Sequence, residues 1–231
     1  MDSGSSRATD GGGGGPAGDG AEAGRLEWFI AGRWQEFEGE ARANLFRVVT
    51  VCAFYLVELA NYHGLDLGVV QMPKVASVDR PFHTAITALC VAWLAVAWVV
   101  SVCLRRQVFP ASLKYASTAC DAVLLTAMLL VADGPRSPLL IGYFVLVNLA
   151  GLRLNLQLIR FTTGVSMAGY LVLLGNARWF HESLRVPRYH QVLFLLSLGL
   201  AGLFAAQAAR RVKELAEDYA ARVAQTERGN A

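Results

Sequence analysis

Long apolar blocks separated by short polar connections dominate the chain between residues 45 and 209. A helix needs about 20 mostly apolar residues to cross the hydrocarbon layer of a membrane. Six blocks approach that length, at about 45–62, 82–104, 113–132, 138–152, 158–180 and 190–209. The fourth block is short, and we expect its helix to run on toward Asn155. The pattern predicts an all-α, polytopic membrane protein with a six-transmembrane-helix bundle over residues 45–209.

The segments before the first block differ from it in character. Residues 1–24 are rich in glycine and nearly free of apolar side chains, so we expect this N-terminal segment to be disordered. In residues 25–44, apolar side chains recur at helical spacing between charged ones. This pattern predicts an amphipathic interfacial helix that lies on the membrane surface.

Residues 210–231, which follow the sixth block, consist almost wholly of good helix formers. Apolar residues in this part alternate in steps of three and four, as in the seam of a two-stranded coiled coil: Ala209, Val212, Ala216, Tyr219 and Val223. Gly202 with Ala206 forms a small-residue pair of the kind found where membrane helices meet. We expect a cytoplasmic signalling helix and a homodimer through the sixth helix; a solvated helical tail is the alternative.

Charge matters here by position, because the net charge is only +3. Arginine and lysine collect before the first block, in the 2–3 and 4–5 connections and after the sixth block, which predicts cytoplasmic N- and C-termini. The 5–6 connection is the exception, with Arg178, Arg185 and Arg188 against Glu182 alone. A nucleic-acid partner has no support, because no basic stripe with interleaved aromatic residues is present.

All four histidines of the chain fall at predicted helix ends: His63, His83, His181 and His190. The predicted topology places them at one depth near the external face. Two such pairs suit axial ligation of b-type haem, and Zn²⁺ also accepts imidazole ligands. Histidine is equally at home at the membrane interface without a cofactor. The haem, zinc and cofactor-free interpretations all stay open.

Among the polar residues inside the apolar blocks, three are candidates for function: Glu58, Asp121 and Asn148. Charge in hydrocarbon costs about 2.5–3.5 kcal/mol on insertion scales, so such residues usually face the bundle and often serve function. We interpret them as candidates for ligand binding or signal coupling. The alternative is a structural hydrogen bond between helices, which is the favoured interpretation for Asn148.

Several stretches resemble the six-helix sensor of bacterial hybrid histidine kinases that detect diffusible fatty-acid signals. They are NLFRVVTVCAFYLVELANYHG (44–64), STACDAVLLTAMLL (117–130), DGPRSPLL (133–140), NLAGLRLNLQLIRFTTGVSMAGYL (148–171) and AARVAQTERGNA (220–231). The last of these resembles the linker that leads into the dimerisation and phospho-acceptor helix of such kinases. The resembled family also has an acid at the position of Asp121. Of the four histidines, the fatty-acid sensors share only His63, followed by Gly64.

The resemblance implies the sensory input module of a signal-transduction protein in the bacterial inner membrane. No phospho-acceptor histidine in a cytoplasmic helix and no ATP-binding glycine-rich box is present, so this chain is not expected to be an enzyme. The output domain would lie downstream in a longer protein, as a histidine kinase or an adenylate cyclase. Related six-helix anchors of class III adenylate cyclases are thought to carry haem on such histidines.

The departure at the other three histidines favours a redox or quinone-sensing branch, so a small lipophilic ligand or a quinone is an expected partner. The alternatives from other classes are a cytochrome-b-like redox subunit and a small transporter. All four histidines at one face weigh against the redox subunit, because electron transfer across a membrane normally needs ligands near both faces.

Overall fold

The structure, a computed structural model, describes residues 17–63, 65–66, 71–72, 80–106 and 111–229. Contacts divide the chain into two units, Met1–Glu36 and Phe37–Ala231. In the first unit, residues 17–36 belong to helix α1 (Ala17–His63). Residues 17–24 are therefore helical where composition predicts disorder; residues 1–16 lie outside the described part. Ala17, Ala21, Glu22 and Ala23 are good helix formers, but Gly18, Gly20 and Gly24 are poor ones, so helix propensity alone does not explain the early start.

Helix α1 also continues through residue 44, where an interfacial helix was expected to give way to the first span. The other elements are β1 (Leu65–Asp66), β2 (Gln71–Met72), α2 (Arg80–Arg105), α3 (Ala111–Val131), α4 (Ile141–Leu152), α5 (Leu156–Trp179) and α6 (Arg188–Gly229). The helices among them begin and end near the limits of the predicted apolar blocks, except that α6 continues through the predicted tail. The strands β1 and β2 form a short antiparallel pair in the first connection. Three 3-10 turns, η1 (Gly134–Arg136), η2 (Pro138–Leu140) and η3 (Glu182–Leu184), occupy the α3–α4 and α5–α6 connections.

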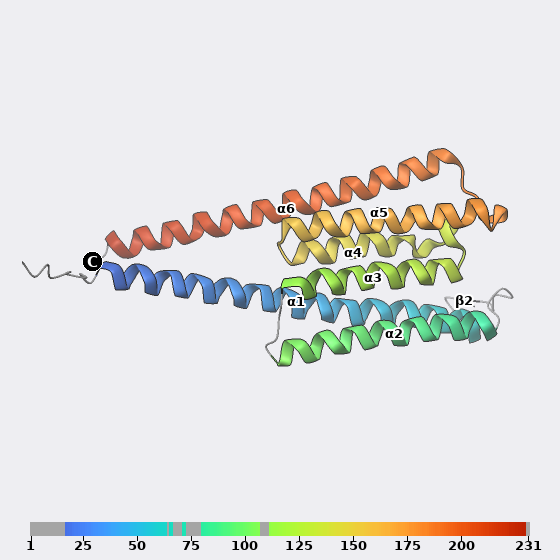
Figure 1. The fold of residues 1–231 in the computed structure, drawn as a ribbon, viewed down its shortest axis with the longest axis horizontal. Coiled ribbons are helices and arrows are strands. Elements are labelled where there is room, and N and C mark those ends of the chain that lie inside the picture. The colour runs from blue at the N-terminus through green and yellow to red at the C-terminus, as the bar shows by residue number, and fades with distance from the viewer. Residues whose placement is uncertain (1–16, 64, 67–70, 73–79, 107–110, 230–231) are drawn as a thin grey trace, which may run out of the picture. The chain divides into compact units, whose positions relative to one another are not determined.

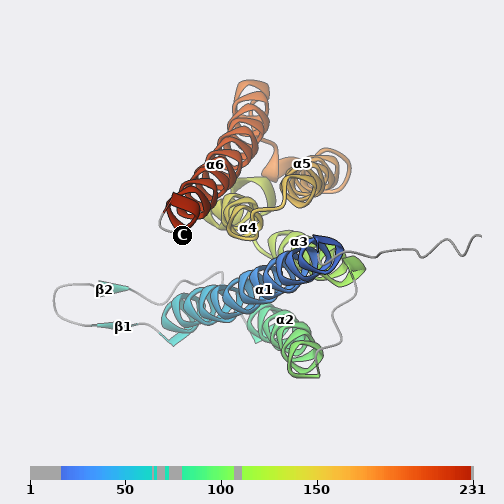
Figure 2. The same ribbon diagram turned by 90° about the vertical axis from the view of Figure 1, so that its left-hand side faces the viewer.

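Within the second unit the helices run alternately up and down (Figure 1). We call one end the hairpin end; it carries the β pair, the α3–α4 turn and the α5–α6 turn. The other is the tail end, where the α2–α3 and α4–α5 connections lie. Helix α3 packs against α2, α4 and α5, and α6 packs against α4 and α5 (Figure 2).

Five helices among the described residues are long and apolar enough to cross a membrane. The fourth apolar segment, Pro138–Leu152, is shorter. The expected extension toward Asn155 is wrong, because α4 ends at Leu152 and Leu154 takes a positive φ of 49°. Asn155 instead caps α5, since its side chain accepts hydrogen bonds from the backbone N–H groups of Gln157 and Leu158.

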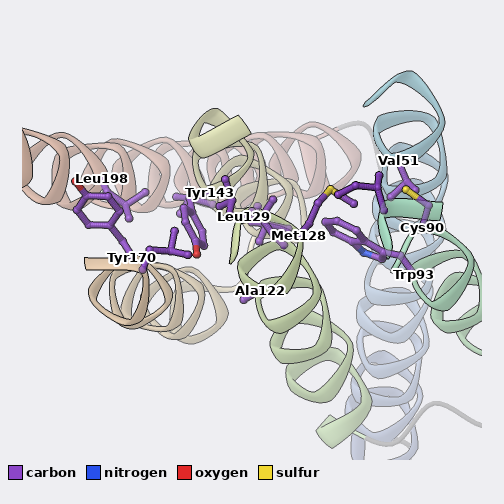
Figure 3. Packing of buried hydrophobic residues seen from close by; sticks show 14 residues of the cluster. Val51, Cys90, Trp93, Ala122, Met128, Leu129, Tyr143, Tyr170 and Leu198 are labelled. Carbon is purple, nitrogen blue, oxygen red and sulfur yellow. The ribbon is translucent and has the colours of Figure 1, made fainter. Parts of the chain in front are cut away.

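One cluster of buried apolar residues contains side chains from all six α-helices, α1 to α6 (Figure 3). It runs from Leu198 of α6 and Tyr170 of α5, past Tyr143 of α4 and Leu129 of α3, to Trp93 of α2 and Val51 of α1. In contrast, apolar side chains on the outer faces are exposed, among them Trp98, Phe204 and Leu203. An apolar exterior around a packed interior is the pattern of a protein that has lipid as its solvent.

Helix α6 continues as one helix to Gly229, well past the apolar part of its sequence. Residues 210–219 are exposed. Ala209, expected in a seam between two copies, is instead buried in its own chain beside Ala150 of α4. Gly202 faces Thr163 of α5, so the small-residue pair permits close packing within the chain. Val212, Ala216 and Tyr219 of the predicted seam are exposed, and the side chain of Val223 lies outside the described part.

Candidate functional site

Near the hairpin end, a carboxylate from α1 meets an imidazole from α2. Glu58 Oε1 lies 2.9 Å from His83 Nδ1, and both side chains are largely buried. The ring of Tyr62 stacks on His83 with a centroid distance of 4.2 Å. The contact is an ion pair when the imidazole is protonated and an N–H donor bond to the carboxylate when it is neutral. The sequence analysis gives Glu58 and His83 as separate candidates, and the structure shows that their side chains are in contact.

Glu58 also lines a cavity of about 380 Å³ between α1, α2, the end of α3 and the α3–α4 turn. The lining is mostly apolar, with Phe54, Ile86 and Met128 among its residues. A mostly apolar cavity with a few polar side chains, here Tyr55, Glu58, Asp133 and Ser137, fits a small lipophilic molecule that presents a hydrogen-bonding head. The Glu58–His83 pair could give a proton to such a head or take one from it.

The helix ends that carry the four histidines all lie at the hairpin end (Figure 1). His63 is exposed and its ring meets the edge of Tyr62, while His181 and His190 are exposed at the α5–α6 turn. Among the described residues, no group of three or more His, Cys, Asp or Glu side chains could hold a metal ion. His83 keeps Nε2 as a possible axial donor, with Glu58 holding Nδ1 in the manner usual for ligating histidines. Haem or zinc on these histidines stays a prediction.

At the tail end, Asp121 of α3 lies at the centre of a buried polar network. Arg47 of α1 donates to Asp121 Oδ2 from Nε (2.9 Å) and Nη2 (2.7 Å), and Trp93 Nε1 of α2 donates to Oδ1 (2.7 Å). Only 3% of the Arg47 side chain and 5% of the Asp121 side chain are exposed. Both carboxylate oxygens are satisfied, so the charge is neutralised inside the bundle and three helices are tied together.

Asn44 extends this network toward the end of α2. Arg47 Nη1 donates to Asn44 Oδ1 (2.5 Å), and Asn44 Nδ2 donates to the carbonyl of Ala97 and to Ser101 Oγ. Asn44 and Arg47 are three residues apart on α1, so they share one face of the helix. That face of α1 is attached to α2 and α3 by polar contacts.

A second buried ion pair lies two turns earlier on α1. Arg153, at the end of α4, donates from Nη2 to Glu40 Oε1 (2.9 Å) and from Nη1 to Thr118 Oγ1 (2.8 Å). The Nε atom of Arg153 is buried without a hydrogen-bond partner in the described part of the chain. Burial lowers the pKa of the Arg153 guanidinium, and the negative charge of Glu40 opposes that shift. The backbones of α1 and the end of α4 come close here, since a Cβ at Gly39 would make an ordinary contact of 3.6 Å with Arg153 Cα.

Sequence reasoning found Asp121 but missed the partners that surround it. It counted Arg47 and Arg153 only as charges that set orientation, and assigned Glu40 to an interfacial helix. The signal that could have revealed them is the spacing of Glu40, Asn44 and Arg47, which places three polar side chains on one face of α1. Asn148 is not part of this network; it is exposed and donates to the Phe144 carbonyl of its own helix (2.8 Å).

Comparison of the chain with protein-family models, with curated proteins and with solved structures gives no match. The features of the chain that bear on its function are the fold and these two buried sites. They lie on one helix, with the Glu58–His83 pair toward the hairpin end and the two arginine–carboxylate pairs toward the tail end.

Proposed function

We propose that this chain is the membrane sensory module of a signal-transduction protein, with six transmembrane helices and both termini in the cytoplasm. The observation that supports this best is the burial of charge at two levels of α1. Glu58 lines a cavity at one level, and Glu40 and Arg47 form buried ion pairs at the other. A helix bundle that only anchors a protein has no need of such groups, because each charge is costly to place in hydrocarbon.

In this proposal, the signal enters at the cavity of about 380 Å³ that Glu58 lines. A ligand with a polar head and an apolar body, such as a quinone, would fill the apolar part and compete for the hydrogen bond between Glu58 and His83. Its binding would favour one of two arrangements of α1, since a ligand can shift an equilibrium only by binding the two states unequally. In the alternative version of the proposal, haem bound to the histidines detects the signal in place of a lipophilic ligand.

The signal leaves along contacts that connect α1 to α6. Glu40 holds Arg153 at the end of α4, and the same end of α4 packs closely on α6. A Cβ built on Gly151 would lie 3.5 Å from the Cβ of Ala205 of α6. A displacement of the Glu40–Arg153 pair would therefore move α4 against α6, and the exposed end of α6 would carry the motion onward. A homodimer through α6 and a downstream kinase or cyclase domain complete the proposal.

The test measures whether the Glu40–Arg153 pair controls the position of the end of α6. Spin labels are placed at Arg105→Cys and Glu217→Cys, both exposed, in a chain whose four native cysteines are replaced by alanine. Distances are measured by double electron–electron resonance in nanodiscs, with labelled protein diluted into unlabelled protein. We expect Glu40→Gln to shift the distance distribution by about 2 Å or to add a second population.

The matched control is Glu38→Gln on the same helix. Glu38 also pairs with an arginine, Arg42 at 3.0 Å, but that pair is exposed. We expect its distance distribution to equal that of the unchanged protein. Charge reversal at both partners, Glu40→Arg with Arg153→Glu, should restore the original distribution. A folded Glu40→Gln protein with an unchanged distribution would contradict the proposed path.

Haem is tested separately by the visible spectrum of the purified protein, oxidised and then reduced with dithionite. A Soret band with sharp reduced α and β bands, lost on changing individual histidines to alanine, would establish haem as the input. A folded, colourless protein made with ample haem supply would leave the lipophilic ligand as the input.

A further inference from the structure

The α5–α6 turn holds a cavity that the sensory proposal does not use. It has a volume of about 360 Å³ and lies between the end of α5 and the start of α6. Its polar lining comes from Arg178, Arg185, Arg188 and Gln191. These three arginines are the ones that depart from the positive-inside pattern of the sequence. A concentration of positive charge on the unexpected side of a membrane protein calls for an anionic partner.

The charge around this cavity is not balanced within the described part of the chain. Arg185 pairs with Glu182 (2.9 Å), and both side chains are more than half exposed. Arg178 and Arg188 have no carboxylate partner among the described residues. Arg136 from the α3–α4 turn adds a fourth positive charge, since its Nη2 donates to the Arg185 carbonyl (2.9 Å). Counting Asp133 of the same α3–α4 turn, four arginines and two carboxylates lie at the two turns, which leaves a net positive charge.

Two hydrogen bonds hold the turn in shape. Arg185 Nη2 donates to the carbonyl of Arg178 (3.2 Å), and Gln191 Nε2 donates to the carbonyl of Val186 (2.7 Å). These bonds link the end of α5 and the first turn of α6 to the segment between them. These hydrogen bonds therefore stabilise the turn that holds the arginines of the cavity.

The rest of the lining is apolar. Leu174 and Ala177 come from the last turns of α5, and Val186 from the connection. The neighbouring side chains of Trp179 and Tyr189 are 77% and 66% exposed. Exposed aromatic residues at helix ends mark the interface between head groups and acyl chains. The cavity therefore offers cationic donors and an apolar surface at the depth of a lipid head group.

We propose that this cavity binds the phosphate head group of an anionic phospholipid in the leaflet at the hairpin end. Arg178 and Arg188 would donate to the phosphate oxygens, because guanidinium groups match phosphate in charge and geometry. The first part of an acyl chain would lie along Leu174 and Ala177. Neither Glu58 nor the α1 ion pairs contribute to this site, which shares with the proposed function only the orientation that places both termini in the cytoplasm.

The test counts lipids bound to the full chain by native mass spectrometry from detergent, titrated with phosphatidylglycerol or with phosphatidylcholine. We expect phosphatidylglycerol to bind at least about tenfold more tightly, because both lipids present a phosphate but the quaternary ammonium of phosphatidylcholine brings a positive charge close to the arginines, and one charged contact is worth roughly that factor. Arg178→Gln with Arg188→Gln should remove the preference. Arg210→Gln with Arg211→Gln, which removes the same charge from exposed positions on α6, should keep it.

Further measurements separate binding from folding and lipid from free anion. Without anionic lipid, both double variants should unfold at the temperature of the unchanged protein, because the substituted arginines are exposed. Inorganic phosphate at millimolar concentration should not displace phosphatidylglycerol; displacement would show a site for the free anion and overturn the lipid assignment. Equal affinity for the two lipids, or an unchanged preference in Arg178→Gln with Arg188→Gln, would overturn the site itself.

Discussion

At the scale of single residues, burial separates the polar groups that matter for stability from those that do not. Asp121 accepts from Arg47 and Trp93 on both carboxylate oxygens and is buried, whereas Asn148 is exposed and bonds only to its own helix among the described residues. Both are polar residues in apolar blocks, and the sequence favours a hydrogen bond between helices for Asn148, whereas the structure shows one within its own helix. The difference arises because Asp121 faces α1 and α2, whereas Asn148 faces outward.

This difference gives a prediction for a pair of substitutions. Asp121→Asn leaves the buried Arg47 guanidinium without a counter-charge, and we expect it to lower the free energy of unfolding by about 3–5 kcal/mol. Asn148→Leu removes only a local hydrogen bond at an exposed position, and we expect a change within about 0.5 kcal/mol. Reversible unfolding in mixed micelles measures both. Equal effects of the two substitutions would contradict the assigned network.

At the scale of elements, the contacts among α3, α4 and α5 depend on a missing side chain. Thr126 of α3 and Tyr143 of α4 share a hydrogen bond of 2.7 Å, directly opposite Gly169 of α5. A Cβ at Gly169 would lie 2.6 Å from Thr126 Oγ1 and 2.7 Å from the Tyr143 hydroxyl. In contrast, nothing lies within 4 Å of a Cβ at Gly164 on the same helix.

We therefore expect opposite signs for the same substitution at two positions of α5. Gly169→Ala should destabilise the protein by about 1–3 kcal/mol, because it overpacks the contact and disturbs the Thr126–Tyr143 bond. Gly164→Ala should be neutral or stabilising by up to about 1 kcal/mol, since alanine loses less backbone entropy in a helix. Thermal unfolding of the two variants in the same detergent measures the difference. A stable Gly169→Ala protein would show that α5 does not pack here as described.

At the scale of the whole molecule, α4 decides how many times the chain crosses the membrane. At 1.5 Å per residue, the 15 residues of Pro138–Leu152 give about 22 Å, less than the usual hydrocarbon thickness of about 30 Å. The segment is nevertheless packed against α3, α5 and α6, so much of its surface contacts protein and not lipid. Local thinning of the bilayer can make up the remaining mismatch.

Six crossings predict that the two ends of α4 lie on opposite sides of the membrane. In a chain without native cysteines, Arg136→Cys marks the α3–α4 turn and Gln157→Cys marks the start of α5; both positions are exposed. We expect a membrane-impermeant maleimide to label position 136 in intact cells and position 157 only after permeabilisation. Glu217→Cys on α6 should behave like position 157. Labelling of 136 and 157 from the same side would contradict six crossings.

The sequence by itself determined the class of the protein and most helix positions, because long apolar blocks have one stable solution in a membrane. It also identified Asp121, Glu58 and His83 as unusual, since polar groups are rare in such blocks. Only the tertiary structure decided which of them meet, because Arg47 and Asp121 are 74 residues apart and their contact depends on how α1 crosses α3. It likewise reassigned Ala209 and Gly202 to packing within the chain, and it gathered the arginines of the α5–α6 turn around one cavity. Periodicity shows which face of a helix is polar or small, but the partner of that face is set by packing against helices distant in sequence.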